Sequence, residues 1–471
     1  MSIHEIHAPG TGALLGAVEK IEVADVARIV SAARAALPQW RRRAPHDRAE
    51  ILRRACVLIA NDSEALAQLH ASESGKIIAQ ARFEVRGAAR LLEANAELGR
   101  MWAGTIAPTG ALPGGERDLT IVERVPLGVV VAVIPFNFPI ELMIEKAAAA
   151  LAVGNVVIVK APPQNPLAIG RVVDLLHEAG VPADVLQMVS GDTPASAALC
   201  AAEGVDAVSL TGSVAAGVGV ATATAAQLRP LHLELGGNGA ALVMPDADLD
   251  YVVSETLRGR LLMNGQACAA TKRVLAHRDI AGELTDRLEA ALSSITPSDP
   301  LVENARLGPL IDERSAARVS AQVDRAIAQG GRRVLGASND GAWFAPTLLT
   351  SVPTNAAVAI DDEIFGPVVT VVPVDDAPHG VAVANASQLR LTAAVFTQDI
   401  PTAMSIAAEF DYGGVVINGT NNYRPPVVPF GGVALAGAGR EGIGFTIEEM
   451  TRTRFIALRN LRPAWDANTK A

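Results

Sequence analysis

The stretch GVVVAVIPFNFPIELMIEKAAAALAVGNVVIVK, residues 128–160, decides the fold class. Two short β-rich runs, GVVVAVIP (128–135) and NVVIVK (155–160), flank the helical stretch IELMIEKAAAALA. Strand, helix and strand in this order are typical of a parallel βαβ unit. DAVSL (206–210) and AALVM (240–244) continue the alternation. The sequence therefore predicts a doubly wound α/β sheet, which binds ligands at the carboxyl ends of its strands.

A second α/β stretch follows from about residue 246 to residue 418. Its clearest strands are VVTVVPV (368–374), LTAAVFT (391–397) and GGVVIN (413–418). We therefore expect two α/β modules in series, each with its own sheet. The first 110 or so residues show helical spacing, as in DVARIVSAARAALPQW, and we expect them to form a helical layer.

Composition narrows the function classes. The 471 residues carry 40 Lys and Arg against 50 Asp and Glu, a net charge of −10, which argues against a general binder of nucleic acid or anionic membranes. The cysteines Cys56, Cys200 and Cys268 are far apart in sequence and cannot all pair, which indicates a reducing compartment and a cytoplasmic protein. No secretory signal, membrane span or zinc-type cysteine spacing is visible, so we expect no bound metal.

Three residues in different segments carry candidate chemistry. Cys268 in NGQACAATKR could be a nucleophilic thiol, Glu234 in LHLELGGNGA a general base, and Asn137 in VIPFNFPIE an amide donor to an oxyanion. Taken singly, each has a more ordinary interpretation: a buried inert cysteine, a surface glutamate on a short strand, and an asparagine that caps a turn. Their occurrence together favours catalysis.

A candidate phosphate site follows the strand AVSL. TGSVAAG (211–217) opens a helix there, and backbone N–H groups at a helix start favour anions. Lys160 ends another strand and could reach a cofactor ribose or phosphate. Gly437, Gly439 and Gly442 match the dinucleotide fingerprint formally, but no βαβ unit surrounds them, so we interpret that match as chance.

Six segments together resemble the aldehyde dehydrogenase superfamily, over essentially the whole chain and in the family's order. They are IPFNFPIELMIEKAAAALAVGNVVIVK (134–160), LTGSVAAG (210–217), LELGG (233–237), NGQACAATKR (264–273), EIFGPVV (363–369) and PFGGVALAGAGREG (429–442).

The resemblance implies two doubly wound α/β domains, a Rossmann-like cofactor domain and a catalytic domain, with a small β oligomerisation element. We expect the cofactor domain at residues 1–117 and 128–236 and the catalytic domain at 237–440. The oligomerisation element would comprise 118–127 and 441–471, with a hairpin near LTIVERVPL and a C-terminal strand near RTRFIAL. It would assemble a homodimer or a homotetramer.

The resemblance also implies a mechanism. Cys268 would attack the aldehyde, and Asn137 with the Cys268 N–H would form the oxyanion hole. Hydride transfer to the nicotinamide would leave a thioester, which water activated by Glu234 would hydrolyse to the carboxylic acid. Lys146 and Glu441 match family positions that support the proton path from that glutamate.

By the same resemblance, NAD or NADP would be bound along the carboxyl ends of the first sheet, with Glu363 on the nicotinamide ribose and Phe365 near the ring. The expected cofactor residues are Ile134, Pro135, Phe136, Lys160, Pro163, Thr211, Gly212, Ser213, Leu235, Gly236, Glu363 and Phe365. The expected substrate pocket comprises Phe138, Leu142, Glu145, Ala267, Ala269 and Arg424.

Two departures from the family pattern bear on specificity. Pro163 replaces the common glutamate that binds the adenine ribose, so we expect NADP to be accepted, alone or alongside NAD. Glu145 lies where many relatives carry a bulky apolar or aromatic residue, and Glu141 is one turn earlier on the same helix. The two are either a solvated or ion-paired helix face, or the wall of a polar substrate tunnel. Arg424 could pair with a substrate carboxylate, as in a semialdehyde, or lie at the surface or an interface.

Two other functions are possible for a chain with this resemblance. An acylating relative would pass the thioester to coenzyme A, but such enzymes usually lack the glutamate found at position 234. A silent structural member would typically have lost Cys268 or Asn137. Both are present, so the sequence favours hydrolytic, NAD(P)-dependent oxidation of a small polar aldehyde or a semialdehyde.

Overall fold

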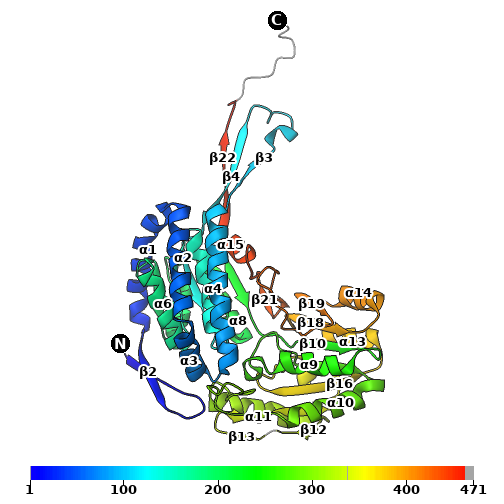
Figure 1. Cartoon of the computed structure of the whole chain (residues 1–471). Helices are drawn as coiled ribbons and strands as arrows, with labels where there is room; N and C mark the ends of the chain where they lie inside the picture. The colour runs from blue at the N-terminus through cyan, green and yellow to red at the C-terminus, as the bar shows by residue number, and fades with distance from the viewer. Residues whose placement is uncertain (1, 337, 462–471) are drawn as a thin grey trace.

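Residues 128–160 form the predicted βαβ unit. Strand β5 (Val129–Val133), helix α5 (Pro139–Ala152) and strand β6 (Val156–Lys160) follow one another, and the two strands pair in parallel. The computed structural model describes residues 2–336 and 338–461 of the chain (Figure 1). Pro139 stands at the start of α5, where its missing N–H costs no helical hydrogen bond, and Gly154 ends the connection at a φ of 98° that favours glycine.

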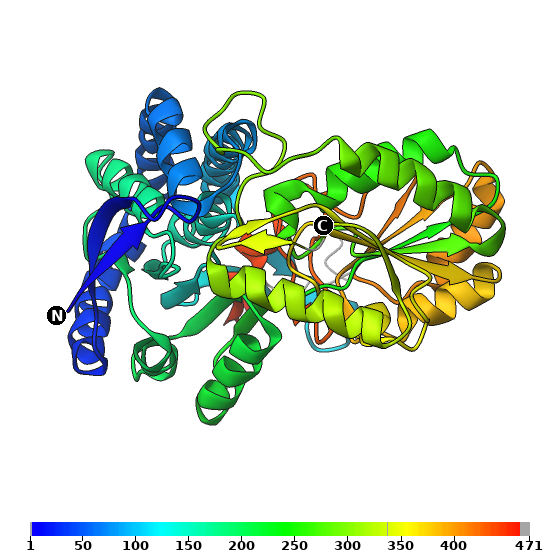
Figure 2. The ribbon, with the colours of Figure 1, turned by 90° about the horizontal axis from the view of Figure 1, so that it is seen from below.

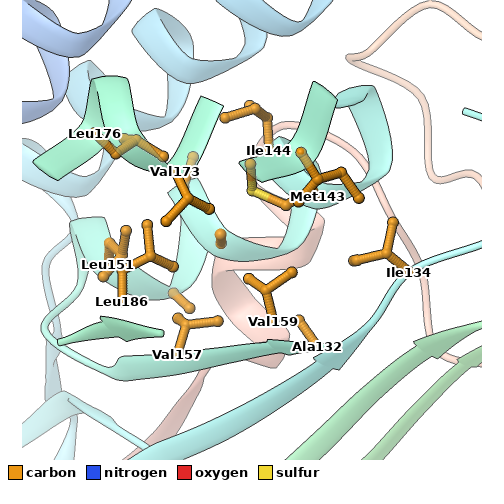
Figure 3. Packing of buried hydrophobic residues seen from close by; sticks show 14 of the residues in the cluster. Ala132, Ile134, Met143, Ile144, Leu151, Val157, Val159, Val173, Leu176 and Leu186 are labelled. Carbon is orange, nitrogen blue, oxygen red and sulfur yellow. The ribbon is translucent and has the colours of Figure 1, made fainter. Parts of the chain in front are cut away.

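A six-stranded sheet is built around this unit in the order β21-β9-β8-β5-β6-β7. Its other strands are β7 (Leu186–Val189), β8 (Ala207–Thr211), β9 (Leu231–Glu234) and β21 (Gly437–Ala438), of which only β21 is antiparallel. The connecting helices are α6 (Leu167–Glu178), α7 (Thr193–Ala201) and α8 (Val214–Thr224). Apolar side chains of α5 and α6 pack against β5, β6 and β7, as Figure 3 shows.

The N-terminal region differs from the expectation. It begins with an antiparallel hairpin, β1 (Ser2–His7) and β2 (Leu14–Lys20), and not with a helix. The prediction of a helical layer was therefore wrong for residues 2–20, because the side chains of this hairpin are mostly exposed and Ile6 is the one buried residue of its two strands, so no regular apolar pattern marks them. The helices that follow are α1 (Val26–Arg42), α2 (Pro45–Asn61), α3 (Ser63–Ser74) and α4 (Ile78–Met101). Figure 2 shows the hairpin at one side of this layer.

A second sheet of seven strands follows in the order β12-β15-β16-β11-β10-β18-β19, parallel except for β12. Its strands are β10 (Ala240–Val243), β11 (Arg273–His277), β12 (Arg332–Leu335), β15 (Thr347–Thr350), β16 (Val368–Val374), β18 (Thr392–Phe396) and β19 (Gly414–Ile417). Its helices are α9 (Leu249–Arg260), α10 (Arg278–Ser293), α11 (Glu313–Ala328), α12 (Ala357–Ile360), α13 (Ala377–Asn385) and α14 (Ile400–Glu409). Two short strand pairs accompany it, β13 (Asn339–Asp340) with β14 (Trp343–Phe344) and β17 (Leu389–Arg390) with β20 (Val433–Ala434).

A three-stranded antiparallel sheet projects from the body as an arm (Figure 1). It consists of β3 (Thr105–Ala107), β4 (Leu119–Pro126) and β22 (Thr451–Leu458), and the short helix α15 (Phe445–Glu449) leads into β22. β22 pairs with β4 along its whole length, from Thr451 opposite Pro126 to Leu458 opposite Leu119. Residues 462–471 of the predicted oligomerisation element lie outside the described residues.

Two parallel sheets with flanking helices and a small β arm confirm the predicted fold class. The predicted domain boundary between residues 236 and 237 falls in the connection from β9 to β10; the boundaries themselves stay a prediction. Within residues 2–336 and 338–461, no helix is both long and apolar enough to cross a membrane.

Candidate active site

The carboxyl ends of the first sheet bring three predicted residues to one edge. In the strand register Val133 lies opposite Lys160, and Thr211 lies opposite Glu234. The carboxyl ends of β5, β6, β8 and β9 therefore lie side by side. Every residue of α5, which starts at this edge, is buried except Glu141. A helix buried all round is normally apolar, so the two charged residues it buries, Glu145 and Lys146, need partners.

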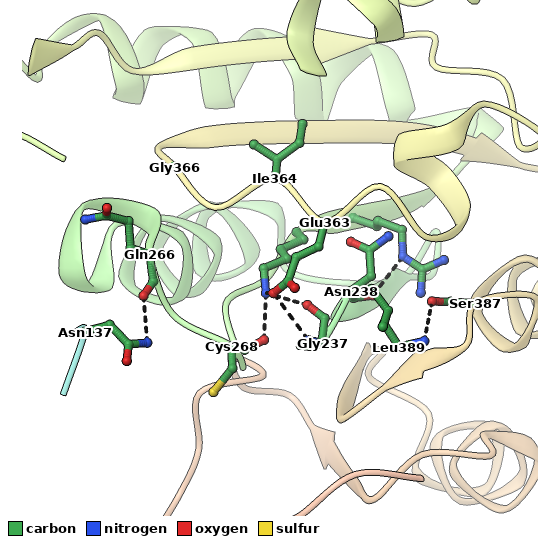
Figure 4. Close-up of polar contacts among 12 residues, drawn as sticks. Asn137, Gly237, Asn238, Gln266, Cys268, Glu363, Ile364, Gly366, Ser387 and Leu389 are labelled. Carbon is green, nitrogen blue, oxygen red and sulfur yellow. Dashed lines mark hydrogen bonds and ion pairs between the residues drawn. The ribbon is translucent and has the colours of Figure 1, made fainter. Parts of the chain in front are cut away.

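Asn137 lies between β5 and α5 and faces the loop that carries Cys268. Its side-chain amide Nδ2 donates to the backbone oxygen of Gln266 at 2.9 Å (Figure 4). Its Oδ1 accepts from the Phe138 N–H at 3.1 Å. Gln266 is two residues before Cys268. The structure therefore brings the predicted amide donor to the predicted nucleophile, from segments 131 residues apart in sequence (268 − 137).

The Cys268 loop is held in an uncommon backbone conformation. Met263 and Asn264 have φ values of 49° and 57°, and Gly265 has a φ of 83° with its α-carbon against the backbone of Gly366. The Asn264 side chain supports the loop by donating to the backbone oxygens of Gly75 and Pro309, each at 2.8 Å. A left-handed backbone conformation costs free energy in residues other than glycine and persists only where the surrounding structure enforces it. This loop therefore holds Cys268 in a fixed position.

Glu234 and Cys268 form the electrostatic centre of the site. Both carboxylate oxygens of Glu234 are buried, and neither meets a hydrogen-bond donor at bonding geometry among the described residues. Burial, with the charge of Glu441, raises the pKa of Glu234 to about 7. Burial and the neighbouring Glu234 charge raise the pKa of the Cys268 thiol well above its usual value. A carboxylate poised near neutrality beside a thiol suits a general base.

The buried Lys146 contacts two polar partners close to Glu234. Its Nζ donates to the Thr211 hydroxyl at 2.7 Å and forms an ion pair with Glu441. The second oxygen of Glu441 accepts from Nη2 of Arg424 at 2.8 Å. Although burial opposes ionisation, Lys146 and Arg424 together hold the pKa of Glu441 below its usual value. Lys146 and Glu441, predicted from separate segments, are therefore directly paired.

Arg424 lies among glutamates and not on the open surface. Its guanidinium stacks 4.2 Å from the centre of the Phe430 ring. Burial disfavours its charge, but Glu441, Glu145 and two further glutamates nearby raise its pKa above the ordinary value. Nε and Nη1 of Arg424 have no hydrogen-bond partner within the described residues, so the group retains donors for a ligand.

The two glutamates of α5 occupy different environments. Oε1 of Glu145 accepts from the Gly442 N–H at 2.9 Å and from the Thr446 hydroxyl, so this carboxylate anchors the segment that follows Glu441. Burial and the nearby Glu441 raise its pKa. Burial raises the pKa of Glu141 to about 6. The interpretation as a solvated helix face is therefore wrong for Glu145, which is buried and hydrogen-bonded, and its place in a substrate pocket stays a prediction.

The other predicted pocket residues surround these groups. Leu142, Ala267 and Ala269 are buried. The Phe138 ring packs 3.9 Å below Nζ of Lys76, a buried lysine paired with Glu84. Oε1 of Glu84 accepts from the Ile140 N–H at 3.0 Å and so caps the start of α5. Sequence reasoning missed this support, since Lys76 and Glu84 lie in the N-terminal helical layer and match no motif.

The segment around Glu363 crosses from the second sheet to the Cys268 loop. Nζ of Lys272 donates to Oε1 of Glu363 at 2.6 Å and to the Cys268 backbone oxygen at 2.7 Å (Figure 4). An added Cβ at Gly236 would lie 2.3 Å from Oε2 of Glu363, so a larger residue there would displace the Glu363 carboxylate. Phe365 meets Phe136 edge to face, with ring centres 6.0 Å apart. Lys272 was not predicted; its place four residues after Cys268 was the available signal.

A cavity of about 470 Å³ lies beyond the carboxyl ends of β5, β6 and β7, between α7 and α8. Its lining includes the predicted residues Lys160 and Pro163, together with Ser190, whose hydroxyl is buried and unpartnered among the described residues. Ser213 caps α8 by accepting from the Ala216 N–H at 3.2 Å, and the Gly212 N–H donates to the Glu234 backbone oxygen at 3.0 Å.

The remaining predicted cofactor residues lie close by. Ile134 and Leu235 are buried, and Pro135 continues from Ile134, whose N–H bonds to the Lys160 oxygen at 3.0 Å. The glycine fingerprint at 437–442 lies partly on β21, an antiparallel edge strand, and so belongs to no βαβ unit. The parts of the chain described here hold no cluster of three His, Cys, Asp or Glu residues suited to a metal.

Comparison with known proteins assigns the family. A profile of the Aldehyde dehydrogenase family matches residues 2–456. The chain belongs to the aldehyde dehydrogenase family. Within this family it is 35% identical over 435 residues to a 3-sulfolactaldehyde dehydrogenase of Priestia aryabhattai, covering 92% of this chain and 90% of the relative. It is 33% identical over 454 residues to a glutarate-semialdehyde dehydrogenase of Pseudomonas putida, covering 96% and 93%.

Solved structures of the family superpose closely. Glyceraldehyde-3-phosphate dehydrogenase GapN of Methanocaldococcus jannaschii, in complex with NADP, matches with a TM-score of 0.92 and 28% identity over 97% of this chain and 99% of that one. Structural neighbours include complexes with NADP and with NAD. The chain is an NAD(P)-dependent aldehyde dehydrogenase, and the family predicted from six sequence segments is confirmed.

Proposed function

We propose that the protein oxidises a small anionic aldehyde to the carboxylic acid through a covalent intermediate on Cys268, which a water activated by Glu234 hydrolyses. The observation that carries this proposal is the meeting of three groups from distant segments. They are the thiol of Cys268, the unpartnered carboxylate of Glu234 and the amide of Asn137, which contacts the loop before the thiol.

In the first step the Cys268 sulfur adds to the aldehyde carbon as the thiol proton passes to a base. Because the pKa of the thiol is raised, the sulfur needs that base, and the neighbouring Glu234 has a pKa of about 7. The carbonyl oxygen becomes an oxyanion, which Nδ2 of Asn137 and the Cys268 N–H stabilise by about 3 to 4 kcal/mol per donor. The product of this step is a thiohemiacetal.

NAD(P)+, when bound, accepts the hydride from the substrate carbon. Glu363, fixed by Lys272, would hold the nicotinamide ribose, and Phe365 would pack near the ring. The 470 Å³ cavity fits the adenosine end, because it lies at strand ends and exposes an unpartnered buried hydroxyl at Ser190.

Hydrolysis of the thioester ends the cycle. Glu234 takes a proton from water as the oxygen adds to the acyl carbon; the carbon–sulfur bond then breaks, and the Cys268 thiolate leaves. The proton on Glu234 reaches solvent through the neighbouring polar groups, Thr211, Lys146 and Glu441, which are linked to one another. Glu234 favours this hydrolytic route over transfer to coenzyme A.

Arg424 supports an anionic substrate. It lies beside Glu441 within the site and retains N–H donors without partners among the described residues. Relatives are named for 3-sulfolactaldehyde and for glutarate semialdehyde, both of which carry an anionic group. A guanidinium recognises carboxylate or sulfonate through paired N–H donors. Glu141 and Glu145 favour a second candidate, an amino- or hydroxyaldehyde, which would use the same chemistry.

A substrate screen tests this proposal. Five-carbon aldehydes ending in a carboxylate, an amine, a hydroxyl or a methyl group are compared by kcat/KM with NADP and with NAD, without coenzyme A. We expect the carboxylate to be the best substrate and Arg424→Met to lose that preference by tenfold or more. Equal kcat/KM for the carboxylate and the methyl compound would refute the anionic class; a product that forms only with coenzyme A would refute hydrolysis.

We further infer a cytoplasmic homodimer or homotetramer assembled through the arm. Among the described residues β22 pairs with β4 alone, and both of its faces expose apolar residues, among them Phe455 (73% exposed) and Ile456 (42% exposed). An exposed apolar edge strand favours pairing with another chain. Light scattering of wild type and of Phe455→Lys tests this: the variant should dissociate.

A further inference from the structure

The cofactor cavity contains an acid that no motif identified. Asp192 follows β7 and lines the 470 Å³ cavity together with Lys160 and Pro163. Its Oδ1 accepts from the Ala195 N–H at 3.1 Å and so caps α7. Its Oδ2 has no hydrogen-bond or ion-pair partner among residues 2–336 and 338–461, and the residue is exposed. A carboxylate oxygen is therefore available to a ligand at this end of the cavity.

The opposite charge enters the cavity from the N-terminal hairpin. Lys20, the last residue of β2, lines the cavity and forms a backbone bridge to Ser190. His4 of β1 also lines it, with Nε2 at 2.9 Å from the Pro163 backbone oxygen. Neither Lys20 nor the buried Lys160 has a hydrogen-bond or ion-pair partner for its ammonium in the described chain.

We propose that Asp192 and Lys20, which both line this cavity, set the cofactor preference. Asp192 accepts the adenosine ribose hydroxyls of NAD, in place of the carboxylate that Pro163 lacks, and Lys20, with Lys160, receives the 2′-phosphate of NADP. The inference rests on the proposed cofactor site and adds two residues that determine its specificity. It implies that the wild-type protein uses both cofactors.

NAD and NADP differ only at the 2′ carbon of the adenosine ribose, and this difference is the physical reason for the two opposite roles. A ribose 2′-hydroxyl is a donor, and a carboxylate is its strongest protein acceptor. A 2′-phosphate has no such donor and is repelled by a carboxylate, whereas an ammonium attracts it. Asp192 therefore favours NAD over NADP, and Lys20 favours NADP over NAD.

Two substitutions test the proposal. Asp192→Asn removes the charge but keeps the cap of α7, because asparagine is an equally good N-cap residue. Lys20→Met removes the ammonium and keeps most of the aliphatic stem. The matched controls are Asp174→Asn, an exposed acid of α6, and Arg28→Met, an exposed cation of α1 paired with Asp25; neither residue lines the cavity.

The first readout is the ratio of kcat/KM with NADP to kcat/KM with NAD. We expect Asp192→Asn to raise this ratio by about tenfold and Lys20→Met to lower it by about tenfold, with both controls within twofold of wild type. A change of less than threefold, or a change in the other direction, would overturn the role of the residue concerned.

The second readout needs no turnover. Titration calorimetry with adenosine 2′,5′-bisphosphate and with adenosine 5′-monophosphate compares binding with and without the 2′-phosphate. Asp192→Asn should strengthen binding of the bisphosphate relative to the monophosphate by about tenfold. Lys20→Met should weaken binding of the bisphosphate relative to the monophosphate by about tenfold. Unchanged relative affinities would overturn the proposal even if every variant oxidises aldehydes normally, whereas loss of aldehyde oxidation with shifted affinities would count against the proposed function alone.

Discussion

The substitution Glu234→Gln tests the central role given to one carboxylate. Burial raises the pKa of Glu234 from the ordinary 4.5 to about 7, and neither of its oxygens has a partner at bonding geometry among the described residues. Water can be activated only by the charged form. The rate of thioester hydrolysis should therefore rise with pH as a single ionisation near pH 7 and fall about tenfold per unit below it. Glutamine cannot take the proton, so kcat should fall by about 10² to 10⁴ and lose this pH dependence.

Stopped-flow measurement of NAD(P)H formation separates the steps. In Glu234→Gln we expect a burst close to one equivalent per site that is slower than in wild type, because Glu234 also takes the thiol proton, followed by still slower turnover, with the acyl group detectable on Cys268 by mass spectrometry. The control Glu141→Gln removes a second glutamate near Arg424, a half-buried one whose carboxyl pKa is about 6, and should keep the ionisation near pH 7. Slow turnover with no acyl group accumulating on Cys268 would refute the assignment of Glu234 to hydrolysis.

Stability gives a measure that is independent of activity. Because the folded-state pKa of Glu234 exceeds its unfolded value, the folded chain binds more protons between pH 4.5 and 7, and this residue lowers stability as pH rises through that window. A shift from 4.5 to about 7 corresponds to about 3 kcal/mol. The free energy of unfolding of Glu234→Gln relative to wild type should increase by about that amount from pH 4.5 to pH 8. A difference independent of pH would show that Glu234 is not buried in its charged form.

Three further outcomes follow from the geometry. Cys268→Ala should abolish aldehyde oxidation and acyl labelling, measured by NAD(P)H absorbance and mass spectrometry, while cofactor still binds; residual turnover above a thousandth of wild type would contradict the covalent route. Lys272→Met frees Glu363 and should raise the Kd for NAD(P)H by about tenfold in a fluorescence titration; an unchanged Kd would show that the Lys272–Glu363 pair does not position the cofactor. Glu84→Gln leaves Lys76 without its buried counter-charge and should lower the free energy of unfolding in urea by about 3 to 5 kcal/mol, whereas the exposed Glu64→Gln should leave the urea midpoint unchanged; similar effects from both would refute the contrast.

Local sequence patterns predicted the parallel strands and the helices between them. β16 occupies 368–374 as predicted, and β5, β6, β18 and β19 lie within one or two residues of their predicted bounds. All of these strands except the edge strand β19 are buried on both faces, so their β-branched runs can be recognised without knowledge of neighbours. The hairpin of β1 and β2 escaped prediction because its side chains are mostly exposed and its stability comes from cross-strand pairing.

The sequence by itself determined the family and the identities of Cys268, Glu234 and Asn137, because a motif records residue types in order along one chain. Only the tertiary structure decided which charges meet. Lys146 pairs with Glu441 across 295 residues, Arg424 joins the same carboxylate, and Lys20 and Asp192 reach one cavity from β2 and β7. Electrostatic energies depend on separation in space and on burial, and neither quantity can be read from distance along the chain.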